Sequence, residues 1–112
     1  MSDTSVQDTP VLVYSTFPDT ESARAAASCL VQQRLAACVN MIPGMRSIYV
    51  WEGKVADDEE TVFLAKTMKS TADAVMQAIA ANHPYEEPAL LVLPTQGGSK
   101  GFCEWIASQV MV

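Results

Sequence analysis

The hydrophobic and polar positions of the chain predict an alternation of strands and helices. Residues 11–17 read VLVYSTF, a β-branched and aromatic run that is typical of a buried strand. Pro18 ends this run, and Asp19 is suited to cap the helix that follows. Arg34 is expected in the last turn of that helix, where a cation is favourable. The helix itself is predicted from small and apolar side chains at helical spacing: Ala23, Ala26, Ala27, Leu30 and Val31.

A long hairpin is predicted next, over residues 37–67. Pro43 and Gly44 interrupt its first strand and indicate a bulge or bend. Residues 48–51 alternate aliphatic and aromatic side chains, so we expect both faces of this strand to be covered. The acidic run of residues 57–60 is expected at a solvated hairpin tip.

The last third of the chain predicts two helices around a short strand. Ser70 and Asp73 resemble a capping box at the start of a helix, and Pro84 ends that helix. Residues 90–93 predict a short apolar strand, and Ser99 is placed to cap a last helix.

The resulting order predicts an α+β fold of the ferredoxin-like type. In this βαββαβ sandwich an antiparallel sheet carries two helices on one face, and here a C-terminal helix is added. Residues 1–9 are polar without periodicity and predict a flexible N-terminal tail, whereas residues 10–112 predict a single domain. Because the two helices cover only one face and the hairpin is apolar on both, we hypothesise that self-association covers the second face.

Composition excludes several classes of protein. The 112 residues are 49% hydrophobic, which is too apolar for a disordered chain. The formal net charge of −6 argues against a nucleic-acid partner, because phosphates attract a basic surface. No apolar run approaches the ~20 residues of a transmembrane helix, and the polar N-terminal segment does not resemble a secretory signal. With three cysteines in no framework spacing, these features predict a cytoplasmic protein with reduced thiols and no membrane partner.

Two side chains are candidates for chemistry. His83, the single histidine, begins the segment HPYEEP, whose imidazole and two carboxylates suit a borderline metal ion or acid–base chemistry. The alternative is that His83 caps a helix C-terminus. Cys38 is a possible ligand for soft Cu(I) or Zn(II) or a nucleophile, and the alternative is a small buried apolar side chain. No partner stands at a spacing that would orient a catalytic nucleophile, so we do not expect an enzyme.

Several segments together resemble the CutA family of divalent-cation-tolerance proteins. The resemblance runs in order from about Val11 to Trp105. It comprises RLAACVN (34–40), IPG (42–44), SIYVWEGK (47–54), Glu60, KT (66–67), HPY (83–85), LP (93–94) and Trp105. The resemblance implies a ferredoxin-like protomer, similar to the PII signalling proteins, that assembles as a compact homotrimer. The long hairpin would then reach across to neighbouring subunits.

The same resemblance implies a role in tolerance of copper and other divalent ions. His83 and Cys38 are the implied metal ligands, with Glu60 as a carboxylate of the inter-subunit cleft. Two departures from the family pattern remove possible ligands, because Ala89 stands in place of a carboxylate and Ser15 in place of a cysteine. No obligatory cofactor is expected, and copper or another divalent cation is the expected ligand.

The leading hypothesis from the sequence is a cytoplasmic homotrimer that takes part in divalent metal-ion, chiefly copper, tolerance and homeostasis. The alternative is a small-molecule sensor or trimeric scaffold of the PII kind, with a ligand in the inter-subunit clefts. The residues expected to line those clefts mix aromatic, anionic and cationic groups: Trp51, Glu60, Lys66, His83 and Tyr85.

Overall fold

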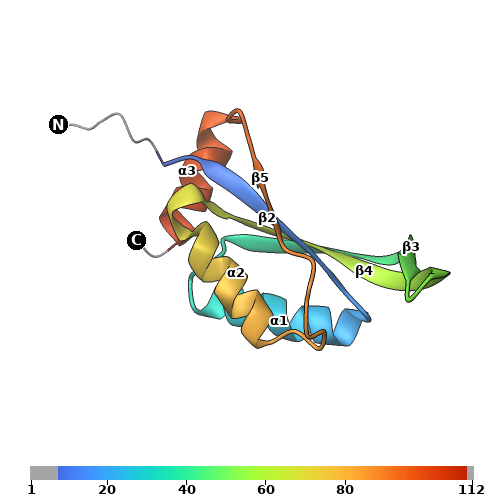
Figure 1. The fold of residues 1–112 in the computed structure, drawn as a ribbon. Helices are drawn as coiled ribbons and strands as arrows, with labels where there is room; N and C mark the ends of the chain where they lie inside the picture. Colours follow the sequence, from blue (N-terminus) through green and yellow to red (C-terminus); the bar gives the residue numbers. More distant parts are fainter. Residues whose placement is uncertain (1–7, 111–112) are drawn as a thin grey trace.

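The computed structural model describes residues 8–110 and has the predicted succession of elements (Figure 1). In chain order these are β2 (Pro10–Phe17), α1 (Thr20–Gln32), β3 (Cys38–Trp51), β4 (Lys54–Met68), a 3₁₀ turn (Lys69–Thr71), α2 (Ala72–Ala81), β5 (Leu91–Pro94) and α3 (Lys100–Gln109). The protein is therefore α+β, as the sequence predicts. Across the described residues, no helix combines the length and apolar character needed to cross a lipid bilayer.

The four strands form one antiparallel sheet in the order β3-β4-β2-β5. Helices α1 and α2 lie on one face of this sheet (Figure 1). Odd-numbered residues of β2 and β4 point to that face and form the core with both helices, which follows from the two-residue period of a strand. Two of them, Phe17 and Phe63, are fully buried with ring centroids 4.8 Å apart. Helix α3 reaches the other face, where Phe102 lies beneath the ammonium group of Lys66.

Strands β3 and β4 form a hairpin that projects beyond the helices and makes the molecule elongated, with extents of 54 × 26 × 24 Å (Figure 1). The predicted interruption is confirmed as a β-bulge. Ile42 pairs with Val62 and Met45 with Glu60, so β3 carries one extra residue between these pairs. Gly44 lies in the bulge with a φ of 82°, a conformation that glycine adopts without steric cost.

The acidic run of residues 57–60 does not form the hairpin tip, and this prediction is wrong. The turn is made by Glu52 and Gly53, whose φ angles are 50° and 80°. The acidic run lies inside β4, opposite residues 45–48 of β3. Acidic residues are poor strand formers in isolation, but pairing across a hairpin, here with the guanidinium of Arg46, outweighs that preference.

In the single chain residues 48–51 are largely exposed, so the cover expected on both faces is not supplied by the chain itself. The exposed fraction is 71% for Ile48, 69% for Val50 and 65% for Trp51, and that of Val55 on the partner strand is 73%. Monomeric proteins rarely leave so much contiguous apolar surface in water. The outer hairpin is therefore a surface suited to contact with another molecule.

The end of α1 also differs from the prediction. The helix ends at Gln32, and Arg34 follows it in the left-handed region with a φ of 60°. Its guanidinium donates to the carbonyl of Ser108 at 3.0 Å and to that of Gln109 at 3.2 Å, and so ties the end of α1 to the end of α3. Helix α3 begins after Ser99, as predicted, although the Ser99 hydroxyl makes no capping hydrogen bond.

Helix α2 begins without the predicted capping box. Its N-cap is Thr71, which makes no side-chain capping bond, and Ser70 instead donates from its amide and hydroxyl to the carboxylate of Asp8. Of the predicted N-terminal tail, residues 1–7 lie outside the described residues. Asp8 and Thr9 are held to the domain, because the carbonyl of Thr9 accepts a hydrogen bond from the 3₁₀ turn before α2.

Candidate functional site

A groove of about 970 Å³ lies between the outer β3–β4 hairpin and the segment that follows α2. Four carboxylates and three large aromatic side chains contribute to its lining, without any lysine, arginine or histidine from residues 8–110. The lining residues are Thr16, Tyr49, Trp51, Asp58, Glu60, Pro84, Tyr85, Glu86, Glu87, Pro88 and Ala89. We call this feature the acidic groove. A smaller hollow of about 300 Å³ between α1 and β3 has no titratable lining group: Ala27, Ser28, Val31, Gln32 and Val39.

The bulge in β3 decides which hairpin side chains face the acidic groove. Even-numbered residues of β4 point away from the helices, because odd-numbered Phe63 and Ala65 lie in the core. Beyond the bulge these even-numbered positions pair with odd-numbered positions of β3, so Tyr49 shares a face with Asp58 and Glu60. The sequence reasoning missed Tyr49 and Asp58. The sequence signal that could have identified them is Pro43-Gly44. A bulge at this position moves the odd-numbered residues of β3 that follow it onto the face of the even-numbered residues of β4.

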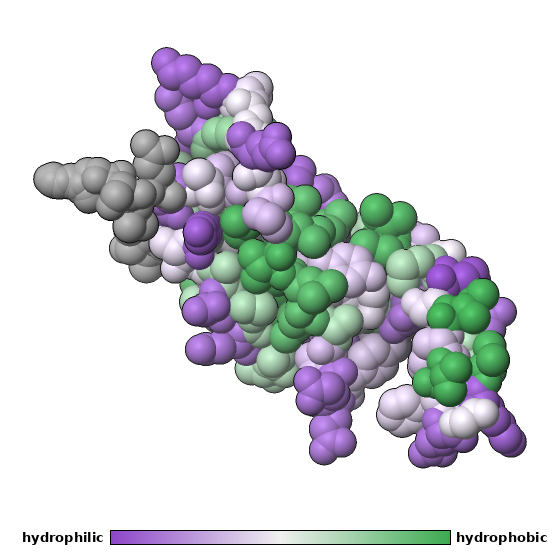
Figure 2. Space-filling view, turned by 45° about the horizontal axis from the view of Figure 1, so that its top comes forward, coloured by the Kyte–Doolittle hydropathy of each residue, from purple (hydrophilic) through white to green (hydrophobic). Residues whose placement is uncertain are grey.

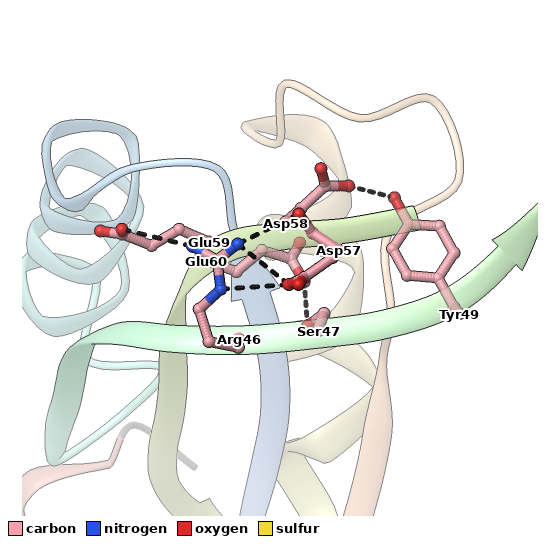
Figure 3. Close-up of polar contacts among 7 residues, drawn as sticks. All are labelled: Arg46, Ser47, Tyr49, Asp57, Asp58, Glu59 and Glu60. Carbon is pink, nitrogen blue, oxygen red and sulfur yellow. Dashed lines mark hydrogen bonds and ion pairs between the residues drawn. The ribbon is translucent and has the colours of Figure 1, made fainter. Parts of the chain in front are cut away.

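Hydroxyl groups hold the carboxylates of the groove. The Ser47 hydroxyl donates to Glu60 Oε1 at 2.6 Å, and the Tyr85 hydroxyl donates to Glu60 Oε2 at 2.8 Å. The Tyr49 hydroxyl donates to Asp58 Oδ2 in the same way (Figure 3). These donors are neutral, so they orient the carboxylates without compensating their charge.

Arg46, the basic partner of the acidic run, lies on the face of the hairpin opposite the groove. Arg46 pairs with Asp57 at 2.9 Å and with Glu59 at 3.7 Å, and these are the ion pairs found among the described residues (Figure 3). Asp58 and Glu60 point the opposite way, because successive side chains of a strand alternate between faces. Negative charge on the groove side is therefore left without a cationic partner in the chain that the structure describes.

Both tyrosines of the groove stay protonated at physiological pH. Burial raises the pKa of Tyr85, and the hydrogen bond to Glu60 and the charge of that carboxylate raise it further. The hydrogen bond to Asp58 raises the pKa of Tyr49, with a smaller contribution from desolvation. Each phenol is thereby a fixed donor, and its ring is positioned by the carboxylate that it binds.

His83 lies beside the groove with both ring nitrogens engaged. Nε2 lies 2.7 Å from the carbonyl of Thr16, and Nδ1 accepts the amide of Tyr85 at 3.0 Å. The ring stacks on Phe17 with centroids 4.1 Å apart. These partners assign a neutral imidazole that carries its proton on Nε2. Burial lowers the pKa of His83, partly opposed by the Thr16 carbonyl and by the charge of Glu60.

The alternative interpretation of His83 as a helix cap does not match its side chain. The imidazole contacts Thr16 rather than a carbonyl of α2. Asn82 takes that role, because its side-chain amide donates to the carbonyl of Ala78 at 2.8 Å. His83 instead ties the segment after α2 to the end of β2.

The structure brings together two of the three predicted metal ligands. Glu60 and His83 both contact Tyr85, through its hydroxyl and its amide. Cys38 lies elsewhere, because it pairs with Lys66, six residues from Glu60 along β4, which corresponds to about 20 Å. Its thiol is half-buried, with the Asn40 amide 3.9 Å away. Within residues 8–110, no three histidine, cysteine or acidic side chains gather closely enough to hold a metal ion.

Ser15 and Ala89, the two departures from the family pattern, occupy different surroundings. Ala89 lines the acidic groove. Ser15 is fully buried on the helix-facing side of β2, and its hydroxyl has no hydrogen-bond partner. A hydroxyl in that position costs free energy, because it has lost water without gaining a partner.

Comparison with known proteins gives one consistent family. The family model for the CutA1 divalent ion tolerance protein matches residues 11–109. Protein CutA 1, chloroplastic, from Oryza sativa is 40% identical over 106 residues, which are 95% of this chain and 60% of the rice protein. The divalent-cation tolerance protein CutA from Thermus thermophilus is 40% identical over 95 residues, 85% of this chain and 92% of that protein. The chain thus spans about 60% of the rice relative and nearly all of the bacterial one.

Solved structures agree with this likeness. CutA1 from Oryza sativa superposes with a TM-score of 0.89 at 38% identity, covering 92% of this chain and 94% of that one. The CutA1 structure from Thermus thermophilus gives a TM-score of 0.87 at 37% identity, covering 91% and 99%. A structure from Archaeoglobus fulgidus, described as a periplasmic divalent cation tolerance protein, gives 0.87 at 33% identity, covering 91% and 99%.

Proposed function

The chain belongs to the CutA1 divalent ion tolerance protein family, and from this premise we propose that it acts in metal-ion tolerance as a homotrimer that binds copper or a similar divalent ion weakly. The observation that carries the proposal is the family match over residues 11–109. The local support is the uncompensated carboxylate of Glu60 beside the only imidazole of the chain.

The homotrimer is supported by the uncovered outer hairpin. Hydrophobic surface gathers in the middle of the face seen in Figure 2 and again at the hairpin end on the right. The aliphatic side chains Ile48, Val50 and Val55 contribute to the second patch. Strand β3 is also an edge of the sheet, whose unpaired backbone groups suit sheet extension by another subunit. We propose a ferredoxin-like protomer in a PII-like trimer, whose hairpins cover neighbouring sheets.

Sedimentation velocity tests the assembly. The wild-type chain is expected to sediment as a trimer, and Ile48→Asp is expected to weaken association by placing a charge in the apolar patch. Ala25→Asp, an exposed position of α1, is the matched control and should leave the assembly unchanged. A stable, folded wild-type monomer at low concentration would contradict the proposal.

Metal binding at His83 is expected to be weak for a geometric reason. An ion at Nδ1 displaces the Tyr85 amide, and an ion at Nε2 displaces both a proton and the Thr16 carbonyl. Glu60 is already bound to two hydroxyls, which compete with a cation for its lone pairs. Cys38 lies too far away to complete the same site within one chain.

Titration with Cu(II) under calorimetry tests these ligands. We expect His83→Ala and Glu60→Gln to lower the affinity, with Cys38→Ser reporting on a separate thiol site. Glu59→Gln and Cys29→Ser are the matched controls, because they remove the same groups at positions away from the groove. Unchanged affinity in all three test variants would reject these ligands.

Two further parts of the proposal concern catalysis and location. The chain acts without catalysis, and it works in the cytoplasm. Cell fractionation tests the location and bears directly on the contrast with the Archaeoglobus fulgidus relative, which is described as periplasmic. Rapid alkylation of Cys38 at mildly acidic pH would point to an activated thiol and would count against the absence of catalysis.

The acidic groove favours a second candidate function. Its volume of about 970 Å³ lies at the upper end of the range for small-molecule sites. We propose as the alternative that the protein is a small-molecule sensor or trimeric scaffold of the PII kind, with a ligand held in this groove. Stabilisation by a small molecule in a thermal-shift screen supports this alternative, and the absence of any stabilising compound opposes it.

A further inference from the structure

The acidic groove is lined by charge of one sign. Asp58, Glu60, Glu86 and Glu87 all contribute to its wall, and no basic side chain of the described residues does. The ion pairs of the described chain lie on the opposite face of the hairpin, at Arg46. An occupant that brings positive charge therefore meets carboxylates that have neutral donors and no competing cation within the described chain.

The groove is also aromatic, and its aromatic rings are held in place. Tyr49 is anchored by Asp58 and Tyr85 by Glu60, while Trp51 lies two residues beyond Tyr49 on the same face of β3. Aromatic faces attract a cation that approaches them, and indole does so most strongly. Because anchoring by carboxylates restricts the two phenol rings, less conformational freedom is lost when a ligand binds.

The size of the acidic groove favours an organic cation over a metal ion as its occupant. A volume of about 970 Å³ far exceeds that of a single ion with its ligands. No three acidic, histidine or cysteine side chains of the described residues gather as a metal would require. Carboxylates dispersed among rings instead suit a cation whose charge is spread over an apolar body.

We propose that the acidic groove binds an organic ammonium ion with an apolar body, held by Glu60 and Asp58 and by the rings of Trp51, Tyr49 and Tyr85. The proposal rests on the second candidate function, a small-molecule site in this groove, and names the chemical class of its ligand. It shares Glu60 with the proposed copper site and differs from it in using the faces of the aromatic rings, which a copper ion does not require.

Tetramethylammonium is the probe, and neopentyl alcohol is its uncharged counterpart of similar shape. Binding is followed by tryptophan fluorescence and by chemical-shift changes in the full-length protein at constant ionic strength, with sodium chloride as the balancing salt. We expect saturable binding of tetramethylammonium in the millimolar range and none of the alcohol. Glu60→Gln should weaken binding about three- to tenfold and Trp51→Ala, read by chemical shift, about two- to fivefold.

Glu59→Gln is the matched control, because it removes the same charge from the adjacent residue on the opposite face of β4. Equal weakening by this variant would overturn the proposal in favour of a general ionic atmosphere. Equal binding of the alcohol would overturn it in favour of an apolar site, which leaves the second candidate function standing.

A cationic side chain of a second copy is the competing occupant. In that case tetramethylammonium fails to bind while Glu60→Gln alters the sedimentation coefficient, and this result overturns the proposal. Absence of saturation by tetramethylammonium up to about 100 mM has the same consequence.

Discussion

Titration of His83 is the most direct test of the site as described. The pKa of this imidazole is expected to lie below its ordinary value of 6.5, because burial against Phe17 disfavours the charged ring. The geometry adds a second reason. Nδ1 accepts the amide of Tyr85, and a proton on Nδ1 would place two donors face to face.

The sign and size of the effect on stability follow from proton linkage. Well above pH 6.5 both the folded and the unfolded chain carry a neutral ring, so His83 contributes no pH dependence there. Between pH 6.5 and the lower folded pKa, the unfolded chain binds a proton that the folded chain does not. Stability therefore falls as the pH falls through this window, by at most about 1.4 kcal/mol per pH unit for one proton.

Nuclear magnetic resonance provides a clean assay, because the chain has a single histidine. The ring carbon-bound protons report the pKa, and the nitrogen shifts report the tautomer. Glu60→Gln should lower the pKa further by removing a charge that favours imidazolium, whereas Glu59→Gln should leave it nearly unchanged. A pKa at or above 6.5, or a neutral ring protonated on Nδ1, would refute the reasoning.

The remaining predictions concern stability and local order. Ser15→Ala should raise the free energy of unfolding by about 1 kcal/mol, because it removes a buried hydroxyl without a partner; a loss of stability in denaturant titration would contradict this. Phe63→Ala should cost about 3–5 kcal/mol by opening a cavity in the core, and a cost below about 1 kcal/mol in the same assay would count against the core assignment. Arg34→Ala should accelerate amide exchange at the end of α3, where the guanidinium holds Ser108 and Gln109, while α2 serves as the internal reference.

The order of the elements could be predicted from periodicity because it depends on local pattern. The apolar run at residues 11–17 predicts a strand, and the helical spacing of the alanines of α1 predicts a helix, from residues close together in the sequence. Arg34 could not be placed in the same way, since its left-handed backbone and its bonds to α3 depend on residues more than seventy positions away. The prediction that the acidic run lies at the hairpin tip was wrong for a similar reason. The strand that contains this run is stabilised by a cross-strand partner rather than by the propensity of its own residues.

The candidate site was only partly within reach of sequence reasoning. His83, Glu60 and Tyr85 could be selected because they stand out chemically, and in the structure Tyr85 contacts both of the others, His83 through its amide and Glu60 through its hydroxyl. The separation of Cys38 from them depends on strand register, which composition does not encode. The hydrogen bond of His83 Nε2 depends on the position of the Thr16 carbonyl, which is fixed only in the folded chain.

The bulge at Pro43-Gly44 has a consequence for how this chain tolerates insertions and deletions. Losing one residue there would leave one residue on each strand between the pair Ile42–Val62 and the pair Met45–Glu60, so the ladder would become regular with its register kept. Tyr49 and Trp51 would therefore stay on the face of the acidic groove. Losing one residue elsewhere in the outer part of β3 has no such extra residue to absorb it, and would exchange the two faces of the part of the strand that slips against β4.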